Sequence, residues 1–117
     1  MSEIWIKTFD PAALAEVPGL QGKWKRFLDA SPASGGMVVG MGELQAGEVA
    51  GWHEHPEPEM FFILEGRALA KWRDADGEHE QEFSAGQAFF KPGDVPHQMV
   101  NLTDGSFRGI FIKLTQL

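Results

Sequence analysis

The chain of 117 residues contains neither cysteine nor tyrosine. Because cysteine is absent, the protein has no disulfide, no thiolate nucleophile and no cysteine-ligated zinc site. A bound metal ion would therefore take nitrogen and oxygen ligands only. The absence of tyrosine excludes a phenol as a general acid or base.

Basic residues are also scarce. Ten lysine and arginine residues stand against seventeen aspartate and glutamate residues, so the net charge is −7, and the longest basic run is Lys25-Arg26. Such a surface disfavours nucleic acids and anionic membranes as partners. No apolar run approaches the ~20 residues of a membrane-spanning helix. In residues 1–9 apolar and polar residues alternate and Glu3 is acidic, whereas a signal peptide has a continuous apolar run. We therefore expect a cytoplasmic protein that binds neither nucleic acids nor membranes.

Length and composition predict one globular domain, residues 1–117. The chain is too short for separate cofactor and substrate domains, and 43% apolar with 23% charged residues is typical of folded proteins. Fourteen glycine and seven proline residues disfavour a helical bundle, since both are costly inside helices and useful in turns. An all-β chain with many turns is expected.

The N-terminal part predicts short elements. Residues 4–6 are expected to form a short strand, and Asp10-Pro11 is expected to open a brief helix with Asp10 as its N-cap. This helix should end at Val17, before Pro18-Gly19. A further strand is expected at residues 24–28.

From Met37 onward, short strands alternate with turn signals at intervals of roughly eight to twelve residues, which is typical of a β-sandwich or small barrel. Asp76-Gly77 is a good hairpin signal. The expected strands are residues 37–44, 49–55, 60–65, 67–73, 79–83, 87–91, 97–101 and 107–114.

His53 and His55 are the first candidate metal ligands. They are separated by one residue, so on a strand both imidazoles project from the same face. Pro56 and Pro58 indicate a bend after them, and the bend lets Glu59 return toward the same centre. Taken alone, His-x-His is a weak signal, and the pattern favours two partly exposed polar residues near a turn.

Two blocks of the sequence carry a wider pattern. The first spans residues 47–66 and reads Gly-x5-His-x-His-x3-Glu-x6-Gly, and the second spans residues 86–101 and reads Gly-x5-Pro-x4-His-x3-Asn. Together they resemble the paired motifs of the cupin superfamily. The one departure is Asp94, which stands where the second family motif has an inner glycine. Because aspartate tolerates left-handed backbone geometry better than most residues, we expect the turn to survive.

The resemblance implies a double-stranded β-helix, or jelly-roll barrel, that holds a metal ion inside. Carried over residue by residue, it makes His53, His55, Glu59 and His97 the four ligands. Three imidazoles and one carboxylate suit divalent iron, manganese, nickel, copper or zinc. With one carboxylate ligand, a divalent ion keeps one formal positive charge, and an octahedral shell leaves two positions open, so an anionic chelating ligand is favoured.

Apolar residues beside the motifs are expected to fill the barrel, and those that share a face with the ligands are candidates to line a substrate pocket. Counting by twos from Glu59 gives Phe61 and Ile63, and counting from His97 gives Met99. The remaining histidine, His79, lies in an acidic segment where a solvated edge strand is favoured over a metal site.

Two functions are open at this point. In the first, a metalloenzyme acts on a small oxygenated, anionic metabolite, and the resemblance allows dioxygenase, isomerase, decarboxylase or lyase chemistry. The absence of tyrosine excludes the family lyases that cleave dimethylsulfoniopropionate with a tyrosine base. A lyase with a carboxylate base stays open, and Glu43 and Glu65 are the candidates for that base. Both residues are equally explained as charged surface residues. In the second, the protein is a non-catalytic module that binds or senses a small ligand or a metal.

The resemblance also implies a homodimer, because cupins often associate through the outer sheet and an N-terminal strand. Residues 4–9, which include Trp5, are the candidate contact segment. The same segment would serve equally to pack on its own barrel.

Overall fold

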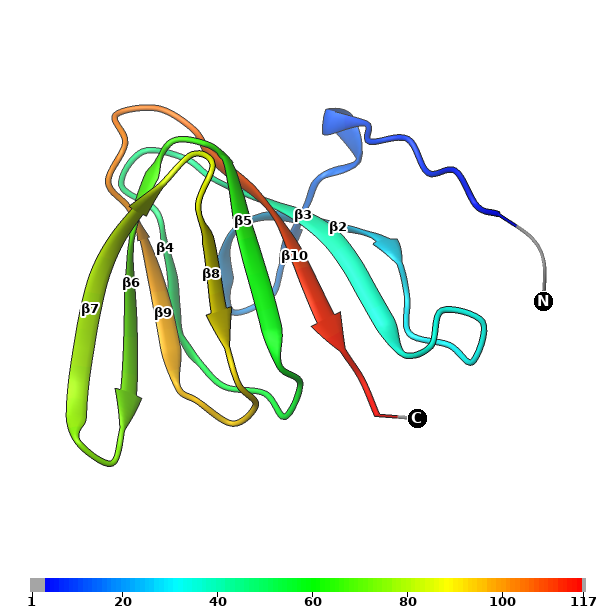
Figure 1. The fold of residues 1–117 in the computed structure, drawn as a ribbon. Helices are drawn as coiled ribbons and strands as arrows, with labels where there is room; N and C mark the ends of the chain where they lie inside the picture. Colours follow the sequence, from blue (N-terminus) through cyan, green and yellow to red (C-terminus); the bar gives the residue numbers. More distant parts are fainter. Residues whose placement is uncertain (1–3, 117) are drawn as a thin grey trace.

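Two antiparallel β-sheets face each other in the computed structural model, which describes residues 4–116 (Figure 1). In spatial order, one sheet contains β1 (Ala15–Val17), β2 (Leu20–Leu28), β3 (Met37–Leu44), β10 (Phe107–Leu114), β5 (Glu59–Glu65) and β8 (Ala88–Lys91). The other sheet contains β4 (Val49–His53), β9 (His97–Asn101), β6 (Arg67–Asp74) and β7 (Gly77–Ser84). This architecture confirms the prediction of an all-β jelly roll. The expected extent of the domain, residues 1–117, stays a prediction.

The hydrophobic core fills the space between the sheets. On β5 the residues alternate in burial, so that Glu59, Phe61 and Ile63 are buried while the intervening residues are partly exposed. Both sheets contribute inward side chains in this way. The buried apolar cluster contains Val38, Leu44, Ala50, Phe61, Ile63, Ala68, Ala70, Phe83, Phe107 and Phe111.

The eight strands predicted from Met37 onward are all present as β3 to β10, with ends displaced by two residues at most. The predicted hairpin at Asp76-Gly77 is confirmed, since β6 and β7 pair as far as Asp74↔Gly77. The displacement that matters for function is at β4, which ends at His53 and leaves His55 in the following loop.

The predicted strand at residues 4–6 is wrong, because the structure has no strand there and Ile4 and Ile6 are each 89% exposed. In Figure 1 this segment leads away from the two sheets. Asp10 is the N-cap as predicted, and its carboxylate accepts a hydrogen bond from the Ala12 backbone N–H at 3.0 Å. However, the helix is a single 3-10 turn, η1 (Pro11–Ala13), and ends four residues before Val17.

A β-hairpin takes the place of the rest of that helix. β1 pairs with β2, with Val17 opposite Leu20 and Pro18-Gly19 between them. Gly19 has a φ of +80°, as required at the third position of a type II turn that has proline second. The same Pro-Gly pair is typical of a helix end and of a hairpin turn, which is why the sequence pattern predicted the wrong element. The strand predicted at residues 24–28 accordingly begins earlier, at Leu20.

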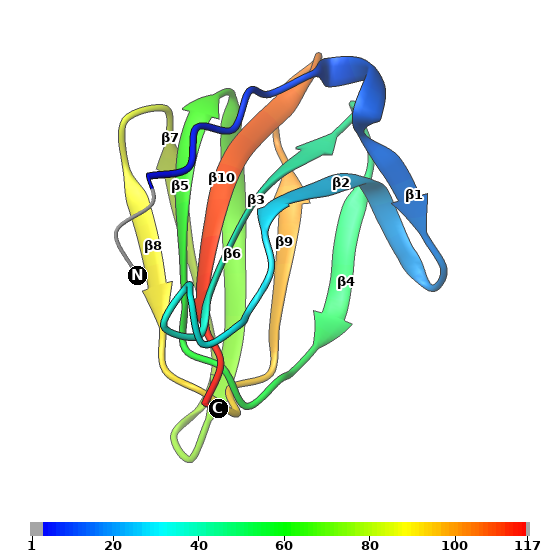
Figure 2. The same ribbon diagram turned by 90° about the vertical axis from the view of Figure 1, so that its right-hand side faces the viewer.

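The hairpin strand β2 also connects the two sheets. The side-chain oxygen of Gln21 accepts a hydrogen bond from the Val49 backbone N–H at 2.7 Å, which joins β2 to β4 of the facing sheet. Figure 2 shows these strands side by side at one edge of the molecule. Within residues 4–116, no helix has the length and apolar character needed to cross a bilayer. The expected cytoplasmic location stays a prediction.

Candidate metal centre

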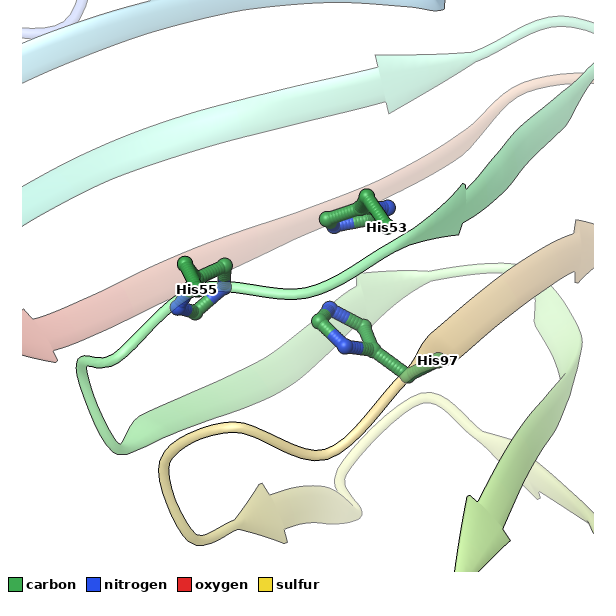
Figure 3. Close-up of side chains that lie close together, drawn as sticks. All are labelled: His53, His55 and His97. Atoms are coloured by element: carbon green, nitrogen blue, oxygen red, sulfur yellow. The ribbon is translucent and has the colours of Figure 1, made fainter.

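Three imidazoles gather where β4 ends and β9 begins (Figure 3). His53 is the last residue of β4 and lies opposite His97, the first residue of β9, while His55 follows in the loop. Potential ligand nitrogens of the three rings all lie within 4.8 Å of one another. One ion can therefore be reached by all three side chains.

His55 reaches the cluster from a loop and not from a strand. The expectation that His53 and His55 share one face of a continuous strand is wrong, because β4 ends at His53. Pro56 and Pro58 follow closely, and proline cannot donate the hydrogen bonds that a central strand needs. The predicted bend is therefore present but begins before His55, and the ring centroids of the two histidines are 6.0 Å apart.

All three imidazoles are held in one tautomer. In each ring Nδ1 lies within hydrogen-bonding distance of a backbone carbonyl two residues away, and a carbonyl only accepts, so Nδ1 carries the proton. Each Nε2 then keeps a free lone pair for a metal ion, as in other histidine metal sites. The three pairs are His53 with Gly51 (2.7 Å), His55 with Glu57 (3.0 Å) and His97 with Val95 (2.9 Å).

Two of these lone pairs are buried and have no partner among the described residues. They belong to Nε2 of His55 and Nε2 of His97. A buried polar atom without a hydrogen bond costs about 1–3 kcal/mol, and native structures contain few of them. A divalent cation would satisfy both atoms at once, so the residues fit the metal ion that the resemblance implies.

Glu59 lies next to the imidazoles, at the first position of β5. Its Oε1 atom is 3.7 Å from Nε2 of His55 and 3.7 Å from Nε2 of His97. Its other oxygen, Oε2, is 3.7 Å from Nζ of Lys113. Burial raises the pKa of the Glu59 carboxyl, but the polar contact with the His55 imidazole and the charge of Lys113 outweigh burial, so the pKa is lowered overall. The carboxylate is thus ionised and adjacent to two ligand nitrogens.

The two motif loops are fixed to each other behind the imidazoles. Asp94 has a φ of +62°, so the turn does form with aspartate in place of the inner glycine of the family motif, as predicted. Its backbone N–H donates to the carbonyl of His55 at 2.8 Å. The Lys91 ammonium donates to the carbonyls of Glu57 and Pro92, each at 3.3 Å, and adds a second tie between the loops.

Burial lowers the pKa of His97 to about 4. An unfolded chain takes up a proton on this histidine near pH 6.5, whereas the folded chain does not until about pH 4. We therefore predict that the free energy of unfolding of the metal-free protein falls as the pH is lowered from about 6.5 to about 4. Urea unfolding of the wild type and of His97→Gln at several pH values measures this effect. Equal pH slopes for the two proteins would contradict the prediction.

A cavity of about 290 Å³ opens beside the candidate ligands. His53, Glu59 and His97 contribute to its wall, together with two of the predicted pocket residues, Phe61 and Met99. Ile63, the third, does not line the cavity, because it lies farther along β5 and is packed in the core with an exposure of 0%. The other lining residues are Val17, Leu20, Trp24, Lys25, Arg26, Ala50, Ala70, Phe89, Gln98, Phe111 and Lys113.

The residues that the sequence analysis set aside or ranked low lie elsewhere. His79 stacks on Trp72 and shares a hydrogen bond of 2.8 Å with the Asp74 carboxylate on the β6–β7 hairpin. Glu43 accepts hydrogen bonds from the Arg108 guanidinium, and Glu65 is exposed at the end of β5. Neither glutamate lines the cavity.

The basic side of the cavity was not predicted from the sequence. Lys113 lies two residues beyond Phe111 on β10, so strand alternation alone puts both on the inner face. β2 also contributes Trp24, Lys25 and Arg26 to the cavity wall. No sequence pattern indicated this, because the β1–β2 hairpin was not predicted.

Comparison with known proteins gives a consistent result. The family model named Cupin domain matches residues 40–113. A Cupin 2 conserved barrel domain protein from Salinispora arenicola superposes with a TM-score of 0.76 at 24% identity, over 97% of this chain and 90% of that one. The plu4264 protein from Photorhabdus luminescens gives a TM-score of 0.78 at 16% identity, also over 97% and 90%.

A third similar structure is oxalate decarboxylase from Bacillus subtilis, a protein with Mn(II) centres. Its TM-score is 0.76 at 18% identity, over 100% of this chain and 32% of that one, so this chain spans about a third of that enzyme. A comparison with curated protein sequences finds no match. Structural likeness at these identities shows the fold, and the family model covers well over half of the chain. The protein belongs to the cupin family.

Proposed function

We propose that this cupin binds one divalent transition-metal ion through His53, His55, Glu59 and His97, and that it acts on a small oxygenated, anionic metabolite that coordinates the ion. The observation that carries the proposal is the convergence of three imidazoles in one tautomer, with two buried Nε2 atoms that lack a partner in the described chain. Iron, manganese, nickel, zinc and copper all accept this donor set. Manganese is the first to test, because the similar oxalate decarboxylase has Mn(II) centres.

The ion would supply Lewis acidity, or activation of dioxygen, at a site that the protein shapes. The backbone carbonyls that accept from each Nδ1–H orient the three rings and direct their Nε2 atoms toward the ion. The apolar part of the cavity wall excludes water and so strengthens electrostatic contacts with a bound ligand. These roles are the same for any of the reaction types that the sequence left open.

One observation favours the alternative, a non-catalytic module that binds or senses a small ligand or metal. Within residues 4–116, Glu59 is the only carboxylate that lines the cavity, and the proposal already uses it as a ligand. No second carboxylate of the described chain is therefore in place to move a proton on a bound substrate.

Activity measurements on metal-loaded protein separate the two functions. The protein is loaded in turn with iron(II), manganese(II), nickel(II), copper(II) or zinc(II) and mixed with hydroxy acids, uronates and diketones, while oxygen consumption and product formation are followed. The enzyme proposal predicts turnover of at least one compound, abolished in His97→Ala. Tight binding without turnover for every metal would favour the module, and failure to retain any metal would contradict the metal centre and the enzyme proposal.

We also propose a homodimer formed through the N-terminal segment. Ile4 and Ile6 are each 89% exposed and Trp5 is 43% exposed, so this segment leaves apolar surface uncovered on the single chain. A second copy would cover it. The mass in solution of the wild type, compared with that of Trp5→Ser, tests this assembly.

A further inference from the structure

Lys113 is a positive charge built into the inner face of the barrel. On β10 it lies opposite Glu59 of β5 and opposite Val38 of β3, and residues opposite each other in antiparallel strands share a face. Glu59 and Val38 are both buried, so this face is the interior. The Lys113 side chain is 23% exposed and lines the cavity. It therefore meets any molecule that enters the cavity.

The charge of Lys113 is only partly compensated. Its ammonium is 3.7 Å from Oε2 of Glu59, beyond hydrogen-bonding distance, and no residue between 4 and 116 accepts a hydrogen bond from it. The other lysine beside Glu59, Lys91, already donates to two backbone carbonyls. An ammonium has three donors, so Lys113 keeps free donors at the cavity.

A bound divalent ion would leave Lys113 with still less compensation. Oε1 of Glu59 lies beside two ligand nitrogens, so the single negative charge of this carboxylate would mainly compensate the charge of the metal ion. The cavity would then hold an excess of positive charge inside a protein whose net charge is −7. An anionic ligand is the partner that such a site stabilises.

Apart from the candidate ligands and Lys25, Arg26 and Gln98, the rest of the cavity wall is apolar and partly aromatic. Trp24, Phe61, Phe89, Met99 and Phe111 contribute side chains beside Lys113. The volume of about 290 Å³ is close to the lower limit of about 300 Å³ for ligand pockets. A small molecule with a hydrocarbon or aromatic body therefore fits this wall better than a sugar or a polyhydroxylated acid.

We propose that Lys113 binds the carboxylate of the ligand, and that the ligand class is small carboxylic acids with an apolar or aromatic body. This inference rests on the proposed function, since it names the substrate class of the same site. Lys113 acts as a specificity-determining residue: its ammonium donates to the carboxylate, while the aromatic side chains contact the body.

Calorimetric titration with a matched pair of probes tests the inference. The probes are 3-phenylpropanoate and the neutral 3-phenylpropanamide, and the protein is loaded with Mn(II). The wild type is expected to bind the acid more tightly than the amide. Lys113→Gln should weaken binding of the acid by roughly 10- to 100-fold and leave binding of the amide unchanged. Lys113→Arg should retain the preference for the acid.

A control variant removes the same charge elsewhere. Lys23 is exposed on β2 and does not line the cavity, so Lys23→Gln should leave both affinities unchanged. If Lys23→Gln and Lys113→Gln lose the same affinity for the acid, the loss follows from the net charge of the protein and not from a contact with Lys113, and the inference is overturned. An unchanged acid affinity in Lys113→Gln, or no binding of the acid to the wild type, would also overturn it.

Metal content is measured in the same samples, so the two proposals fail in different ways. If the wild type and Lys113→Gln both retain Mn(II) but show the same preference for the acid, the inference about Lys113 is wrong and the metal site stands. If neither retains Mn(II) or any of the other four divalent ions, the metal site is wrong, and the two probes are then compared on the metal-free protein. A preference for the acid that depends on Lys113 would support the anion site even in that case.

Discussion

Replacement of His97 by alanine is expected to abolish stoichiometric metal binding. His97 supplies a buried Nε2 atom that no described residue satisfies, and it lies opposite His53 where the two motifs meet. Changes to groups that only orient a metal ligand typically cost 10- to 100-fold in metal affinity, so loss of a ligand itself should cost at least ~100-fold. Elemental analysis after dialysis, with calorimetric titration of the metal-free protein, measures the loss.

His79→Ala is the matched control for this experiment. It removes an imidazole of the same size from the β6–β7 hairpin, where His79 contacts Asp74 and Trp72 and is not part of the cluster. The metal content of this variant should equal that of the wild type. Equal retention by His97→Ala, His79→Ala and the wild type would contradict the assignment of the site.

Gly93→Ala is expected to have the second large effect, on stability and metal affinity together. A Cβ atom at Gly93 would lie 2.1 Å from the backbone oxygen of Pro56 and 3.0 Å from its carbonyl carbon. Backbone atoms cannot rotate away as a side chain can, so the two loops must separate. The hydrogen bond from Asp94 to His55, 2.8 Å long, would be strained or lost, and His55 would move away from the other ligands.

The expected destabilisation is about 1–3 kcal/mol, the usual cost of forcing an extra carbon into a packed site. Urea unfolding of the metal-free protein measures it, and titration with Mn(II) measures the accompanying loss of affinity. Gly105→Ala is the control, because a Cβ at Gly105 meets no atom within 4 Å and the backbone there is not left-handed. A Gly93→Ala protein as stable as Gly105→Ala and with full metal affinity would show that the close contact between the loops is unimportant.

The strands were predictable from the sequence where local signals and the fold agree. The strands from Met37 onward carry both an alternating pattern and turn residues at their ends, and their positions are confirmed within two residues. The outcome at Asp94 was also predictable, because only a few residue types tolerate a φ of +62°. His97 is 38 residues beyond Glu59, and no spacing rule brings it to His53; the resemblance to a family did so.

The N-terminal part was mispredicted for a physical reason. β1 has three residues, all exposed, and exists because β2 offers it hydrogen bonds. Such an element has no periodic pattern of its own to detect. The basic side of the cavity was missed for the same reason, since Lys25 and Arg26 reach the cavity only through the position of β2 in the sheet. The alternation of β10 alone predicts that Lys113 faces inward. That it lies beside Glu59 of β5 and Val38 of β3 follows only from the order of the strands in the sheet.

The most direct test of the metal centre is anomalous X-ray diffraction from crystals of the zinc-loaded protein at the zinc absorption edge. We predict one strong peak, with Nε2 of His53, His55 and His97 and a carboxylate oxygen of Glu59 each at about 2.0–2.2 Å from it. A peak at His79 and Asp74, or no peak among the three imidazoles in zinc-saturated crystals, would contradict this prediction.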